Sequence, residues 1–321
     1  MRTLYVVGNG FDLYHGLKTK YQHFGVFLKN GNPKIYDYLL CYYGLPDLDE
    51  DYLLWSEFEQ SLANLDVEQV LEDNSHLVAN PSSDDFRDRD WHTLTIEMEM
   101  FLKDLTLELI KEFNKFILNV KYPELDSGKR LSLNEKAIYL NFNYTDSLES
   151  YYGINENQIL YIHKKASSSS DLILGHGSNP ENFTEKEETK PENISEEELE
   201  LWLEYMSDKY EYSFTSGKDE LLKYFRDSFK ETNKVIEENE VFFRDLCEVD
   251  EVIVMGHSLS EVDRPYFIKV KESINRNAAW HVTYYGNEER EKHRNSLREI
   301  GISDESIKLV EMNSLISAMA L

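Results

Sequence analysis

The sequence predicts an α/β fold, a doubly wound and mostly parallel sheet with helical insertions. Short apolar runs rich in β-branched and aromatic residues alternate with amphipathic helical patterns in the first and last thirds of the chain. Between these parts, residues 29–130 and 178–241 show mainly helical periodicity. We therefore expect a single α/β domain whose sheet is assembled from residues 1–28, 131–177 and 242–321.

The expected strands are short and apolar, as in a parallel sheet that is buried on both faces. They cover residues 3–8, 137–142, 158–163, 172–177, 251–259, 279–286 and 307–310. The expected helices carry apolar side chains at every third or fourth position. They cover residues 16–28, 52–65, 94–120, 221–243, 264–275 and 288–300. The acidic stretch at 181–200 is expected to be a solvated loop that leads into a helix.

Composition limits the classes of function. The 321 residues are 41% hydrophobic and 13% aromatic, which is enough for a sizeable core. The formal net charge of -27 repels a nucleic-acid backbone or an anionic membrane, so we expect neither as a partner. Cys41 and Cys247 form no disulfide framework, and no run reaches the ~20 apolar residues of a membrane span. We expect a cytoplasmic protein.

The first expected strand ends in Gly8-Asn9-Gly10 and leads toward a helix. In this geometry backbone amides and a helix N-terminus can approach a phosphate closely. The complete G-x-G-x-x-G pattern is absent, however, and a tight turn needs glycine for steric reasons alone. Asp12 would repel a pyrophosphate unless it has another task, such as capping the helix. A phosphate-binding loop and a plain turn are both compatible with this stretch.

Polar residues and one glycine lie at or just after the ends of several other expected strands. They are Asn143, Thr145, His163, His176, Gly256, His257, Ser258 and Asp263. Open α/β sheets bind their ligands at the carboxyl ends of the strands. This clustering of polar groups at strand ends predicts a ligand site there better than any single motif does.

The histidines suggest acid-base or metal chemistry. The ordinary pKa of histidine, about 6.5, makes His163 a candidate general base, although a buried histidine that donates to a carbonyl group fits the same pattern. His163, His176 and His257, together with Asp12 or Asp263, are ligand types suited to zinc or manganese. No HExxH motif and no closely spaced histidine pair supports a metal, and we expect none.

Four motifs, taken together and in this order, resemble the AbiH family of bacteriophage abortive-infection proteins. They are GNGFDLYHGLKTKYQHF, FNYTDSLE followed by IH, LILGHG, and GHSLSEVDRPYF. The resemblance spans the whole chain and implies antiphage defence by abortive infection in response to an unidentified phage trigger. One position departs from the family, which commonly has Ile-His-Gly where this chain has Lys164 after His163.

The layout is also similar, more distantly, to sirtuin-like NAD-binding domains. That similarity implies a Rossmann-like fold that binds NAD, with His163 and Asn143 as catalytic residues. The implied nucleotide-binding residues are Gly8, Gly10, Gly256, Ser258 and Asp263. We expect Asn9, Asp12, Thr145 and His176 to contribute to the same nucleotide site. Thr145 stands where many sirtuin-like chains have aspartate, and Lys164 replaces a glycine. The four-cysteine zinc site of protein-deacylating sirtuins is missing, which argues against that activity.

The resulting hypothesis is an antiphage protein with a pocket for a small nucleotide, NAD being the first candidate, and with NAD glycohydrolase activity to be tested. Two alternatives stay open. One is a nucleotide-binding sensor or interaction module without catalysis, and the other is a metal-dependent nuclease toxin. The negative net charge disfavours the nuclease. Homo-oligomers are common in such systems, although no residue pattern here specifies an interface.

Overall fold

The computed structural model describes residues 2–48, 54–169, 171–184, 195, 197–202 and 211–316. These residues form a six-stranded parallel sheet with the strand order β3-β2-β1-β4-β5-β6. The strands are β1 Arg2–Val7, β2 Ile138–Asn141, β3 Ile159–Tyr161, β4 Val249–Met255, β5 Ala279–Tyr284 and β6 Ile307–Glu311. This is the strand order of dinucleotide-binding sheets, in which the direction of winding reverses beside the first strand. The predicted doubly wound fold class is confirmed.

Helices cover both faces of this sheet. On one face, α1 (Asn9–Tyr14) and α8 (Ser147–Tyr152) pack against a core that includes Tyr139 and Met255. The other face has a separate core that includes Val254 and Leu297. The helices on that second face are α12 Thr232–Glu238, α13 Glu240–Arg244, α14 Arg264–Ser273 and α15 Gly286–Glu299.

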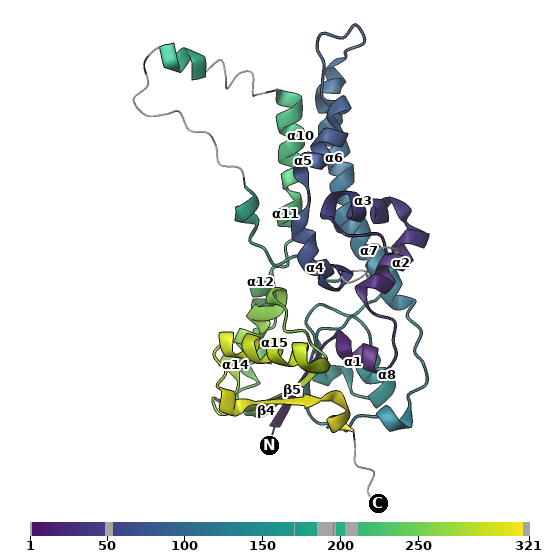
Figure 1. The fold of residues 1–321 in the computed structure, drawn as a ribbon, viewed down its shortest axis with the longest axis vertical. Coiled ribbons are helices and arrows are strands. Elements are labelled where there is room, and N and C mark those ends of the chain that lie inside the picture. The colour runs from purple at the N-terminus through teal and green to yellow at the C-terminus, as the bar shows by residue number, and fades with distance from the viewer. Residues whose placement is uncertain are drawn as a thin grey trace, which may run out of the picture.

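A helical layer lies over the carboxyl ends of the strands and has its own core (Figure 1). Its helices are α2 Tyr21–Gly31, α3 Pro33–Tyr43, α4 Phe58–Ser61, α5 Val67–Asp73, α6 Thr93–Lys103, α7 Leu109–Leu118, α10 Tyr212–Leu222 and α11 Tyr224–Asp227. Sequence signals define several of the ends: α3 begins at a proline after the Asn32 cap and ends at Gly44, which has a left-handed φ. No helix in the described part of the chain is long and apolar enough to cross a membrane.

The helical layer contacts the loops that follow β2 and β3. The Phe113 ring of α7 lies 4.9 Å from the Tyr144 ring, measured between centroids. Asn114 Nδ2, from the same helix, donates a hydrogen bond of 2.8 Å to the carbonyl oxygen of Ser167. The carboxyl edge of the sheet is therefore covered by the helices between β1 and β2.

The prediction of a strand at residues 172–177 is wrong. This segment makes one isolated bridge, between His176 and Phe229. The His176 amide donates to Ser228 O at 3.0 Å, and the Lys230 amide donates to His176 O at 2.9 Å. A Cβ on Gly175 would lie only 2.2 Å from Ser228 O, so glycine is needed for this close approach. The segment pairs with a turn of the helical layer instead of joining the sheet.

Several expected helices are shorter than the periodicity indicated. Residues 221–243 form four helical pieces, because the turn at 228–231 is held by the backbone of His176. Within residues 16–28 the helix begins only at Tyr21, since Gly16 has a φ of 83° and interrupts it. Of the acidic loop expected at 181–200, residues 185–194 and 196 lie outside the described residues.

Three glycines allow the β1 and β4 loops to touch where the sheet changes its direction of winding. A Cβ on Gly8 would lie 2.6 Å from His257 Cα, and a Cβ on Gly10 would lie 2.7 Å from Gly256 Cα. Gly256 has a φ of 63°, and its own added Cβ would lie 2.3 Å from Phe11 N. The Gly10 amide donates to Gly256 O at 2.7 Å. Glycine is required here for direct contact between two backbones.

Gly256→Ala and Gly153→Ala test this contact as a matched pair, because both glycines have a positive φ, 63° and 66°. No atom lies within 4 Å of a Cβ on Gly153, so alanine there should lower the unfolding free energy by only about 1 kcal/mol. Gly256→Ala adds a backbone clash, and we expect a loss of at least about 3 kcal/mol in urea unfolding. Equal losses in the two variants would contradict the steric role.

Candidate functional site

The strand register brings the predicted loops to one edge. Val7 lies opposite Asn141 on one side and Met255 on the other, and Asn141 lies opposite Tyr161. The residues that follow β1, β2, β3 and β4 therefore emerge side by side. This is the carboxyl edge at which open α/β sheets hold their ligands.

A buried cluster of ionisable side chains surrounds Asp263 at this edge. Asp263 ends the short 3-10 turn Glu261–Asp263 before α14, and His163 follows β3 by two residues. His163 Nε2 lies 3.4 Å from Asp263 Oδ1, and His257 Nε2 lies 3.4 Å from Asp263 Oδ2. Ser260 Oγ donates to Oδ2 at 3.2 Å. One carboxylate thus serves two histidines.

The helical layer adds two charged residues to this cluster. Lys230 lies in the turn between α11 and α12 and is only 2% exposed. Its Nζ donates to Asp263 Oδ1 at 3.0 Å and to Glu59 Oε2, on α4, at 2.7 Å. Glu59 also accepts a hydrogen bond from the Tyr21 hydroxyl of α2. We call Asp263, His163, His257, Lys230 and Glu59 the Asp263 cluster.

Burial and mutual charge set the protonation states in the Asp263 cluster. Burial alone would raise the pKa of Asp263, but Lys230 and His163 lower that pKa to well below its ordinary value. Burial opposes the charged form of Lys230, yet Asp263 and Glu59 raise its pKa above the usual range. Burial and the Lys230 charge lower the pKa of His163. At neutral pH the cluster therefore holds an aspartate anion, a lysine cation and a neutral His163.

Several buried polar atoms at this edge have no hydrogen-bond partner. They include His163 Nε2 and the Tyr266 hydroxyl. The Tyr266 ring lies 5.6 Å from the His163 ring. His163 Nε2 lies 3.4 Å from Asp263 Oδ1 without the direction of a hydrogen bond. Unpaired buried polar groups are uncommon, and these are free to pair with a ligand.

A second polar cluster lies on the opposite face of the sheet, beside α1 and α8. Thr145 Oγ1 and Ser147 Oγ each donate to a different oxygen of Asp12 at 2.6 Å. All three residues are buried. Burial raises the pKa of Asp12 to about 6, although the hydrogen bonds from Ser147 and Thr145 oppose this rise. Asp12 is thus tied to the β2 loop and does not cap α1.

The remaining predicted residues lie in different surroundings. Asn9 exchanges two hydrogen bonds with Thr19 and so fixes the loop between α1 and α2. Ser258 is exposed. His176 is buried outside the Asp263 cluster, with its ring near Phe183, Phe225 and Phe229. Within the described ranges, no group of three His, Cys, Asp or Glu side chains is arranged to hold a metal ion.

Sequence reasoning did not select Lys230 or Glu59. Both belong to segments with helical periodicity and many charged residues, in which a charged side chain is usually solvated. The only available signal was the polar run Ser228-Phe229-Lys230-Glu231-Thr232, which breaks the helical pattern. Lys164, the departure from the family motif, has a φ of 64°, the left-handed conformation that favours glycine.

Ionisable groups lie at the carboxyl edge of the sheet, where the direction of winding reverses. Together with the strand order, they define an α/β protein of the ligand-binding, doubly wound type. The chain matches the family described as Bacteriophage abortive infection AbiH over residues 4–284, and it belongs to that family. Its role is therefore in the abortive infection of phage-infected cells. No curated protein and no solved structure matches the chain.

The raised pKa of Asp12, about 6, predicts a specific pH dependence of stability. Between about pH 4 and pH 6 the folded protein retains a proton that the unfolded chain has released, so the unfolding free energy falls as pH rises through this window. Asp12→Asn removes this effect. From pH 4 to pH 7, urea unfolding should show wild type losing up to about 3 kcal/mol relative to the variant. Parallel pH profiles would show that Asp12 is not desolvated.

Proposed function

We propose that this chain binds NAD, or a closely related nucleotide, at the carboxyl edge of its sheet and cleaves the bond between nicotinamide and ribose. The main support is His163, a buried and neutral imidazole that lies 3.4 Å from the Asp263 carboxylate. A neutral histidine that a carboxylate orients is suited to act as a general base. Depletion of NAD would stop the metabolism of an infected cell, which agrees with abortive infection.

The proposed reaction is a hydrolysis. The C1′–N bond breaks, and its electron pair leaves with nicotinamide while positive charge develops on the ribose carbon. The Asp263 carboxylate stabilises that charge. Water forms the new C–O bond, and its proton passes to the imidazole of His163 and then to solvent. The products are nicotinamide, ADP-ribose and a proton. Asn143, whose side chain lies beside Asp12, would hold the ribose.

The charge of the Asp263 cluster favours one end of the dinucleotide. Two carboxyl groups, of Asp263 and Glu59, face the single ammonium group of Lys230. With His163 neutral, the two carboxyl groups attract the cationic nicotinamide ring and repel the pyrophosphate. The proposed orientation therefore places the nicotinamide riboside end near His163. The pyrophosphate would lie toward the β1 loop, where the backbone carries no charge.

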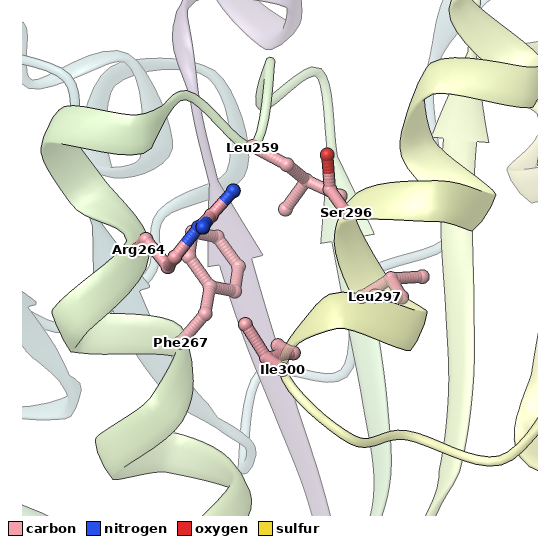
Figure 2. A pocket seen from close by; sticks show the side chains of 6 residues that line it. All are labelled: Leu259, Arg264, Phe267, Ser296, Leu297 and Ile300. Carbon is pink, nitrogen blue, oxygen red and sulfur yellow. The ribbon is translucent and has the colours of Figure 1, made fainter.

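Access to the cluster requires movement, because four of its five residues, all except Glu59, are buried. A pocket is found elsewhere, between α14 and α15 (Figure 2), and it is lined by Leu259, Arg264, Phe267, Ser296, Leu297 and Ile300. None of the residues that line this pocket belongs to the Asp263 cluster. The loops after β1 and β4 are also in direct contact. A dinucleotide therefore enters only if the helical layer shifts away from the carboxyl edge.

The proposal predicts that purified protein consumes NAD and releases nicotinamide and ADP-ribose in equal amounts. His163→Ala should reduce the rate of NAD loss by about 100- to 10,000-fold, the usual contribution of a general base. Asn143→Ala should weaken substrate binding. Chromatographic measurement of all three compounds over time gives both the rate and the stoichiometry.

His76→Ala is the matched control, because His76 is an exposed histidine of the helical layer. It should retain the wild-type rate. If wild type consumes no NAD but NAD raises its melting temperature, the chain is a binding module without catalysis. If NAD is neither consumed nor bound, the proposal is wrong.

A further inference from the structure

Two charged residues of the Asp263 cluster do not come from the loops that follow the strands. The helical layer supplies Lys230 and Glu59, and a continuous chain of polar contacts runs from Tyr21 through Glu59, Lys230 and Asp263 to His163. The proposed reaction uses neither Lys230 nor Glu59 directly. Lys230 is fully buried and Glu59 is half-buried beside the proposed base, and this requires an explanation, since unneeded buried charges are costly.

We infer that Lys230 and Glu59 are positioning residues, through which the helical layer fixes the carboxylate of Asp263 and sets the reactivity of His163. The inference rests on the proposed function for the catalytic role of His163. Its physical content is the coupling among these side chains, which can be measured without any substrate.

The geometry assigns each oxygen of Asp263 a separate environment. Oδ1 lies between Lys230 Nζ, at 3.0 Å, and His163 Nε2, at 3.4 Å. Oδ2 accepts from Ser260 Oγ at 3.2 Å and faces His257 Nε2. Lys230 is thus the one cation of the cluster that contacts the oxygen facing His163. Without its ammonium group, the carboxylate would lose its lysine counter-charge while it stays buried.

The backbone around Lys230 is fixed on both sides. The Lys230 amide donates to His176 O at 2.9 Å, and its carbonyl oxygen accepts from the Thr232 amide at 2.7 Å. The preceding Ser228 carbonyl accepts from the His176 amide at 3.0 Å. The side chain of Lys230 is fully buried, so water cannot substitute for its two carboxylate partners. The lysine is therefore held in place by the fold as well as by charge.

Lys230 and Glu59 have opposite effects on the protonation of His163. The charged and titratable side chains around the ring are Asp263, Lys230, Glu59, Tyr144 and Tyr266. Phe142 contributes an apolar ring edge at 5.2 Å between centroids. The Lys230 cation disfavours protonation of His163, whereas the charges of Asp263 and Glu59 favour it. Opposite effects on the same histidine provide a test that a purely structural role would not satisfy.

The test is an NMR titration of the histidines in the full chain. His163 is one of nine histidines, and its signal is identified by its absence in His163→Ala. Lys230→Met should shift the His163 titration midpoint to higher pH than in wild type. Glu59→Gln should shift it to lower pH. Lys234→Met is the control, because Lys234 is an exposed lysine four positions away whose partner is Glu231, and it should leave the midpoint unchanged.

Unchanged midpoints in both variants, or shifts of the same sign, would overturn the inference. If Lys230→Met fails to fold, the double variant Lys230→Met/Glu59→Gln removes both charges together. It should titrate at higher pH than Glu59→Gln, since the two proteins differ only at Lys230, and identical midpoints would overturn the inference as well. The two proposals fail separately. Wild type that does not consume NAD contradicts the proposed function, whereas an unmoved His163 midpoint contradicts the positioning role.

Discussion

The buried ammonium group of Lys230, held between Glu59 and Asp263, is the interaction on which the arrangement of this protein depends. It joins the helical layer to the carboxyl edge of the sheet at the point where the winding reverses. Removing one partner of a buried ion pair costs about 3–5 kcal/mol, because the other charge is left without compensation. The same ion pair therefore links packing of the helical layer to the electrostatic state of the candidate site.

The two faces of the sheet present different chemistry at this edge. On the α14 face, an ionised aspartate, a lysine and a neutral histidine form a polar cluster with unpaired atoms. On the α1 face, Asp12 is closely bound by two hydroxyl groups, which fixes the β2 loop against α1. Between them, the glycine loops after β1 and β4 are in direct backbone contact. The two polar clusters are thus separated by the sheet itself.

The sequence predicted the parallel sheet well because its strands are short apolar runs that end in polar residues. The register then brought His163 and Asp263 together, although 100 positions separate them in the chain. Lys230 was missed because a lysine in a charged helical segment is normally solvated, and no local pattern shows that it is buried. The apolar residues and glycines of the segment at 172–177 are typical of a strand. They suit its observed pairing with the turn at Phe229 equally well. Such tertiary contacts leave no periodic signal in the chain.

We propose that the Asp263 cluster carries the activity that aborts phage infection. The most direct measurement compares the plating efficiency of a phage restricted by the wild-type protein on cells that produce wild type, His163→Ala or His76→Ala at equal levels. We expect that His163→Ala restores plating to the level of unprotected cells, whereas His76→Ala protects as wild type does. Full protection by a folded His163→Ala protein would contradict the claim and place the activity outside this cluster.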